Sequence, residues 1–293
     1  RLPSPSVPQK RPSVFIAASL AVLSAVVLAV MARSNTVVFY DSIWYGMRPD
    51  RVLFGPTGFY DYLGLTTQVH YYPKLYELLI SPLQEWGDTS FAIGFGVCCL
   101  LFFSAAVYSL ARSFGMSAQV SAGLAIAMAA LPAVAGTAET TKGDLLASAF
   151  VLMAIIALKF SRDREDPSFL TDVIVFALLA SATRLSVLPW LAILFVLFLS
   201  RLFVHAYRHP GKVAAWLKSW DSCLIAVALL AFGLVHYRTW LLTGTPVVTN
   251  DSTQKLFDAL GFGLKYPVGS FTGSSAPEGL GVALSYIHEL ALA

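Results

Sequence analysis

The segment YDSIWY at residues 40–45 comes just after the first long apolar run of the chain, and these two features decide how the fold is interpreted. The run covers residues 14–32, carries no charge, and is long enough to cross a bilayer as a helix. Asp41 should therefore lie near a membrane surface, between aromatic rings that suit the interface. The polar loop that follows is about fifty residues long, and its aromatic content favours a folded, functional loop over a disordered one.

The composition indicates a polytopic membrane protein. Hydrophobic residues make up 57% of the 293 residues and charged residues only 13%, whereas a soluble domain carries about 25% charged residues. The net charge of +3 comes from basic residues in short loops, a pattern that orients membrane helices and predicts no nucleic-acid partner. The three cysteines lie within apolar runs without a CxxC pair, so neither a disulfide nor a thiolate metal site is expected.

Hydropathy predicts an all-α bundle of transmembrane helices. Six apolar runs follow the loop, over residues 91–111, 120–135, 145–160, 173–182, 187–203 and 222–237. Alternating them from a cytoplasmic N-terminus puts the basic loops around Arg112, Lys159 and Arg201 on the inner side, as the positive-inside rule requires. The outer side then receives the Asp41 loop and the segments 137–144 and 183–186, with everything after Arg238.

This topology divides the chain into three parts. Residues 1–13, rich in proline, serine and basic residues, form a disordered cytoplasmic N-terminus. Residues 14–248 form a transmembrane module whose outer loop covers residues 33–89. Residues 249–293 form an outer loop and the start of a truncated further span. Within the first outer loop, Leu75, Leu78, Leu79 and Leu83 recur at helical spacing, which predicts an amphipathic helix lying on the membrane or packed on the bundle.

Charged groups from four outer segments converge on one face in this topology. Asp41 heads the first segment, Glu139, Lys142 and Asp144 belong to the second, and Arg184 and Arg238 stand in the last two. Ionisable groups near a membrane are costly and usually functional. Cations could hold the phosphate of a lipid-borne sugar, and a carboxylate could take the proton of an attacking acceptor.

These segments together resemble a family. The chain has Asp41 in a long first outer loop, then ETTKGD at residues 139–144, TRLS at 183–186 and YRTW at 237–240 with GTP behind it. This order is similar to that of the GT-C membrane glycosyltransferases of the protein mannosyltransferase and aminoarabinose transferase type. The likeness covers residues 14–248. It implies a GT-C-like bundle with juxtamembrane helices in the first loop, and inverting sugar transfer on the outer face of a bacterial inner membrane.

The resemblance also implies roles for individual residues. Asp41 matches the catalytic aspartate, the general base. Lys142, Arg184, Arg238 and Arg48 fall where basic groups could meet the donor phosphate, although Arg48 precedes Pro49 here, whereas bacterial relatives place the arginine after the proline. Glu139 and Asp144 fall where members place further acidic groups, some of which bind a divalent metal ion. The implied partners are a polyprenyl-phosphate-linked sugar, a lipid, glycan or protein acceptor, and membrane lipids.

Structural and functional alternatives stay open on the sequence. Asp41, Glu139 and Asp144 could cap helices, since Asp is a good N-cap, and Lys142 could extend along the apolar surface with its charge in water. Arg184 could pair with a carboxylate of another helix. A transporter or flippase for an anionic substrate could use the same cations, although the chain shows no internal repeat. A non-catalytic subunit of an envelope-assembly complex is the third hypothesis.

Overall fold

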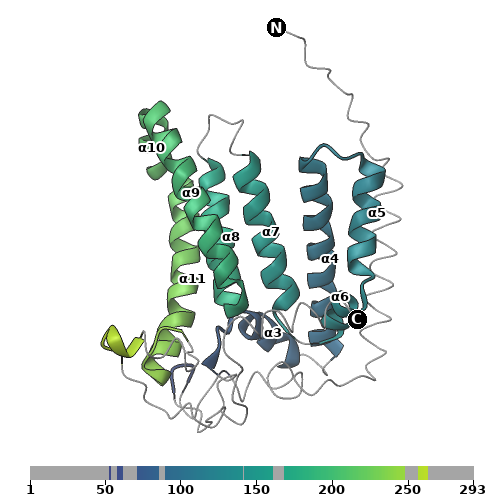
Figure 1. Ribbon diagram of the computed structural model, residues 1–293. Helices are drawn as coiled ribbons and strands as arrows, with labels where there is room; N and C mark the ends of the chain where they lie inside the picture. The colour runs from purple at the N-terminus through teal and green to yellow at the C-terminus, as the bar shows by residue number, and fades with distance from the viewer. Residues whose placement is uncertain are drawn as a thin grey trace.

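The computed structural model describes residue 53 and residues 58–61, 71–85, 90–140, 142–160, 168–247 and 257–262. This part of the chain is mostly helical and contains no strand. The apolar run at residues 14–32, Asp41, Arg48 and the predicted further span near residue 279 lie outside the described residues. The long helices run side by side, with two short helices, α3 and α6, at one end and another, α10, at the opposite end (Figure 1).

The first two long helices illustrate how local sequence sets the elements. Helix α4 (Ser90–Ser113) ends where Gly115 adopts a left-handed backbone with φ of 82°. Helix α5 (Ala118–Ala129) begins at Ser117, whose side chain accepts a hydrogen bond from the backbone N–H of Val120. This is the usual chemistry of helix ends, a glycine after the last turn and a serine before the first.

The predicted span over residues 120–135 is broken in the structure. Helix α5 and the short helix α6 (Pro132–Glu139) meet at a bend of 71°. Leu131 between them is extended, with φ of −58° and ψ of 130°. Pro132 explains this conformation, because a proline ring disfavours the helical backbone in the residue before it. The predicted run is therefore a bent pair of helices, interrupted at Leu131.

The remaining long helices follow the predicted apolar runs but extend beyond most of them. They are α7 (Asp144–Phe160), α8 (Ser168–Thr183), α9 (Leu188–Arg208) and α11 (Trp220–Thr243), with a short 3₁₀ turn, η3 (Leu185–Val187), before α9. Helix α10 (Pro210–Leu217) lies in the predicted loop between the last two spans. Helix α7 packs between α4 and α8, and α8 also packs against α11.

Length and composition indicate a membrane protein. Among the described residues, 94–113, 185–208 and 220–243 are long and apolar enough to cross a membrane, and the bent pair α5–α6 would make a fourth span. Helix α8 is apolar but shorter. Helices α9 and α11 expose many large hydrophobic side chains, including Phe195, Val196 and Phe203 on α9. Such broad apolar surfaces are unusual on soluble proteins and are expected in contact with lipid.

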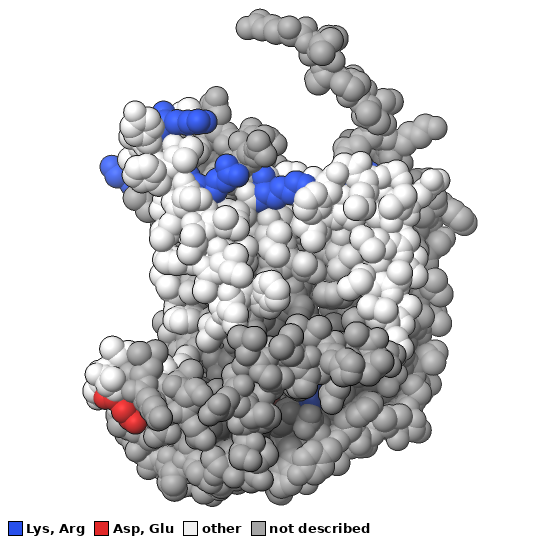
Figure 2. Space-filling view, viewed as in Figure 1, with Lys and Arg blue, Asp and Glu red and all other residues white. Residues whose placement is uncertain are grey.

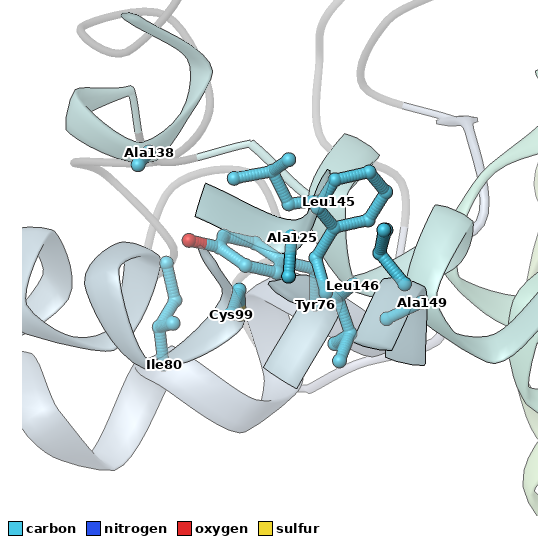
Figure 3. Packing of buried hydrophobic residues seen from close by; sticks show 10 residues of the cluster. Tyr76, Ile80, Cys99, Ala125, Ala138, Leu145, Leu146 and Ala149 are labelled. Atoms are coloured by element: carbon cyan, nitrogen blue, oxygen red, sulfur yellow. The ribbon is translucent and has the colours of Figure 1, made fainter. Parts of the chain in front are cut away.

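The predicted loop helix exists as α3 (Leu75–Glu85), and it packs against one end of the bundle. Among residues 75–81, the part of α3 whose side chains are described, Tyr76, Glu77 and Ile80 are buried, whereas Leu79 is 45% exposed. Figure 3 shows the phenol ring of Tyr76 in a cluster with side chains of α4, α5, α6 and α7. The leucine spacing predicted the helix correctly, but the buried face is centred on Tyr76 and Ile80.

The two ends of the bundle differ in charge. Arg112, Lys159 and Arg208 lie in the last turns of α4, α7 and α9, at the end where α10 lies, which we call the basic end. Figure 2 shows basic side chains gathered there on the viewed face. The opposite end, where α3 lies, holds the start of α7 and the C-terminal ends of α8 and α11, and we call it the α3 end.

Candidate functional site

The α3 end brings two of the predicted site residues into direct contact. Asp144 begins α7, and Arg184 stands in extended backbone between α8 and the 3₁₀ turn. The Nε of Arg184 donates to Oδ1 of Asp144 over 2.8 Å, and the two side chains are 28% and 35% exposed. The pair thus joins the beginning of one helix to the end of the next while remaining within reach of a ligand.

A second ion pair at this end is almost completely buried. The Nζ of Lys74, just before α3, donates to Oε1 of Glu77 over 3.0 Å. The side chain of Lys74 is only 2% exposed and that of Glu77 11%. Burial lowers the pKa of Lys74; Glu77 opposes this shift, and the positive charges of Arg238 and Arg184 add to it. Lys74 is therefore close enough to both arginines to be affected by their charges.

Arg238 is buried and bonded to the backbone of the first loop. Its Nε donates to the carbonyl of Phe59 over 2.8 Å, and a terminal nitrogen donates to the carbonyl of Leu53 over 3.2 Å. Its guanidinium carbon lies 4.9 Å from the centre of the Phe59 ring, and the residue is 1% exposed. This arrangement suits a residue that positions the loop on α11, because the guanidinium is buried and donates to two loop carbonyls.

The last turns of α11 make two further hydroxyl contacts, one to the same loop and one to the segment that follows the helix. Thr239 Oγ1 donates to the carbonyl of Tyr71 over 3.0 Å, and Thr243 Oγ1 lies 3.1 Å from the carbonyl of Thr245. The helix ends at Gly244, whose backbone is left-handed with φ of 89° and whose N–H bonds to Trp240. Arg238 and Thr239 together therefore fix the segments around Phe59 and Tyr71 against α11.

Gly143 allows α3, α7 and α8 to meet closely. A β-carbon on Gly143 would lie 2.8 Å from Cγ2 of Thr183 and 3.0 Å from Cβ of Tyr76. The first distance is shorter than real Cβ contacts and the second is tighter than most of them, so a larger residue requires its neighbours to move. The close approach sets the neighbouring Asp144 beside Arg184, which directly follows Thr183.

Tyr76 adds a phenol group to the same end. Its hydroxyl is buried and has no hydrogen-bond partner among the described residues. Burial raises the pKa of Tyr76 well above 10.0, and the nearby carboxylates of Glu77 and Asp144 raise it further. The phenol therefore stays protonated over the ordinary pH range and keeps an O–H to donate.

The other predicted site residues are only partly located. Glu139 ends α6, and Lys142 lies in the turn before α7, where its backbone N–H bonds to the carbonyl of Thr140. The backbone of both is at the α3 end. Asp41 and Arg48 lie outside the described residues, so their roles stay predictions.

The described carboxylates do not form a metal site. Asp144 and Glu77 each bond to a cation, and within the described ranges no three His, Cys, Asp or Glu side chains lie close enough to share a metal ion. We therefore derive no step through a metal, and the divalent ion implied by the resemblance stays a prediction.

Sequence reasoning missed Lys74, Glu77 and Tyr76 as members of this cluster. The spacing of Lys74 and Glu77, three residues apart at the start of a predicted helix, was an available signal for an ion pair. Comparisons of the chain with protein-family models, with curated proteins and with solved structures find no match.

Proposed function

We propose that the chain is a GT-C-like membrane glycosyltransferase that takes a sugar from a polyprenyl-phosphate carrier at the α3 end. The observation that supports this function is the half-exposed pair of Asp144 and Arg184 beside the buried Lys74. A guanidinium group that is accessible at the end of a membrane bundle suits the phosphate of a lipid carrier. The basic end would then face the cytoplasm of a bacterial cell, and the α3 end would face outward.

In this proposal Arg184 holds the phosphate of the donor. A guanidinium group carries five N–H donors, so bonding to Asp144 through Nε leaves others for phosphate oxygens. Asp144 fixes the plane of the guanidinium, and Lys142 supplies a second cation from the adjoining turn. Arg238 positions the first loop by donating to two of its carbonyls.

The reaction would be a single inverting displacement with Asp41 as the general base. Asp41 takes the proton of the acceptor hydroxyl or amine as that atom attacks the anomeric carbon. The bond between the anomeric carbon and the phosphate oxygen breaks at the same time. The carrier leaves as polyprenyl phosphate, and its developing negative charge is stabilised by Arg184.

The direct test is release of polyprenyl phosphate from a labelled donor. Full-length protein in lipid vesicles is given polyprenyl-phosphate mannose or its aminoarabinose counterpart, each with candidate lipid, glycan and peptide acceptors. We expect Asp41→Asn to lower release by about 100-fold or more, as the loss of a general base does. Arg184→Gln should lower release by about 100-fold, because a charge-stabilising donor is lost.

The ion pair is well suited to this test because its side chains are 28% and 35% exposed. Exposed pairs contribute about 1 kcal/mol or less to stability, so Arg184→Gln should remain folded. Arg208→Gln at the basic end is the matched control and should keep full activity. Normal release by Asp41→Asn would end its assignment as the base. Movement of labelled donor across the vesicle membrane without release would instead support a flippase.

A further inference from the structure

A hollow of about 810 Å³ lies between α7 and α9 and beside the end of α4, and it runs along α9 from Trp190 in its first turn to Arg201. Its volume falls within the range of small-molecule sites, about 300–1,000 Å³. Leu194 in its lining is buried, whereas Trp190 and Ile193 are 63% and 56% exposed. The hollow is therefore an apolar groove that is open along the side of α9. We call it the α7–α9 groove.

Two cations stand at the basic end of the groove. Lys159 lines it from the last turn of α7, and Arg201 lines it from α9. Lys159 is held in place by an aromatic ring, since its Nζ lies 3.2 Å from the centre of the Phe114 ring. No acidic side chain is among the described residues that line the groove. The groove thus combines an apolar wall with a positively charged end.

This combination matches the chemistry of one kind of occupant. Long basic side chains at the ends of membrane helices extend toward the interface while their stems stay in the apolar layer. Basic pockets between membrane helices on the cytoplasmic side are typical binding sites for anionic lipid headgroups. A neutral chain would gain nothing from the two cations, and a second copy of this protein would have to bring an acidic group to them.

We propose that the α7–α9 groove binds one anionic phospholipid. An acyl chain lies along Val151, Ile155 and Leu197, and the headgroup phosphate contacts Lys159 and Arg201. The site is separate from the pair of Asp144 and Arg184, which lies at the opposite end of α7 and α8. The inference does not depend on the proposed transferase activity.

Trp190 provides a reporter for the test. The full-length protein is reconstituted in two sets of vesicles. In one set the phosphatidylglycerol is brominated and the phosphatidylcholine is not, and in the other set only the phosphatidylcholine is brominated. Bromine quenches nearby indole fluorescence, and subtracting the signal of Trp190→Phe isolates Trp190. We expect half-maximal quenching at a lower mole fraction of phosphatidylglycerol than of phosphatidylcholine. Lys159→Gln and Arg201→Gln should each reduce this preference by about fivefold, the contribution of one basic residue at a membrane surface.

The matched controls are Arg208→Gln and Lys218→Gln, which remove exposed cations at the same end but outside the groove lining. Both should keep the preference. An unchanged preference in the variant lacking both Lys159 and Arg201 would overturn the proposal, as would equal quenching by the two lipids. If the quenching of Trp190 by brominated lipid decreased as the protein-to-lipid ratio rose, a second copy of the protein would be covering the groove in place of lipid. Displacement of the brominated lipid by equimolar polyprenyl phosphate would indicate a carrier-lipid site and would also overturn it.

Discussion

The two ends of the helix bundle carry cations in opposite ways. At the basic end, Arg208 and Lys218 are exposed on the surface. At the α3 end, Lys74 and Arg238 are 2% and 1% exposed, and each has specific partners. Exposed basic residues cost little and are enough to orient a membrane protein. Buried cations are retained only where their partners are in place, so the α3 end is the one built to a fixed geometry.

The largest difference between the ends should appear on removing one arginine from each. Arg238→Met removes two charge-assisted hydrogen bonds, to the carbonyls of Phe59 and Leu53, and the loss of each costs about 1–2 kcal/mol. We therefore expect a loss of about 2–4 kcal/mol in the free energy of unfolding. Arg208→Met removes an exposed side chain and should change stability by about 0.5 kcal/mol or less. Denaturant unfolding of the detergent-solubilised proteins measures both.

A lysine at position 238 refines the same comparison. Arg238→Lys keeps the charge but loses the planar fork that reaches two carbonyls, so it should recover only part of the lost stability. If Arg208→Met proved as costly as Arg238→Met, the contrast between the ends would have no energetic basis.

The contrast also separates what the sequence could predict from what it could not. Apolar runs predicted the long helices, because a helix in lipid must be apolar over most of its length. Alternation of the runs predicted that Asp144 and Arg184 would share an end, and the structure joins them directly. The bend at Leu131 had a visible signal in Pro132, but the continuous hydropathy concealed it.

Partners far apart in the sequence could not be predicted. The carbonyls that Arg238 binds lie 179 and 185 residues away, and no side-chain pattern marks a backbone acceptor. Glu77 is polar, yet it is buried, because Lys74 neutralises it within the same turn. The leucine pattern of α3 indicated a helix but not its buried side, since Gly143 admits Tyr76 and so sets how α3 rests on α7 and α8.

A methyl group at Gly143 tests that close approach. In Gly143→Ala the new Cβ would lie 2.8 Å from Cγ2 of Thr183, so α3, α7 and α8 must separate slightly. Overpacking of this kind costs about 1–3 kcal/mol. Gly233→Ala is the matched control, because a Cβ there meets nothing within 4 Å. It should leave stability unchanged or raise it by up to about 1 kcal/mol, since alanine favours a helix.

A second substitution tests whether the contact with Thr183 causes the loss of stability in Gly143→Ala. Thr183→Ser removes Cγ2 but keeps the hydroxyl that bonds to the carbonyl of Leu179. When Thr183→Ser is combined with Gly143→Ala, it should restore part of the stability that Gly143→Ala loses. If the double variant instead lost the sum of the two single losses, the cost of Gly143→Ala would not come from the contact with Thr183. Thermal unfolding of the four proteins completes the cycle.

The smallest expected effect is the response of the α3 end to pH. Burial lowers the pKa of Lys74 below its ordinary value of 10.5, so between the two values the unfolded chain holds a proton that the folded protein lacks. Stability from this group therefore rises as pH increases toward 10.5. Tyr76 acts in the opposite direction, because its pKa is raised above 10.0 and the unfolded chain loses the phenol proton first.

The two contributions can be separated by substitution. The free energy of unfolding of the wild type minus that of Lys74→Met should increase with pH up to 10.5, because both proteins keep Tyr76. Tyr76→Phe should remove the fall in stability above pH 10.0, and the double variant should lose both slopes. A difference between wild type and Lys74→Met that stays flat across this range would mean that Lys74 is as well solvated in the folded protein as in the unfolded chain. The α3 end would then hold its cations no more tightly than the basic end does.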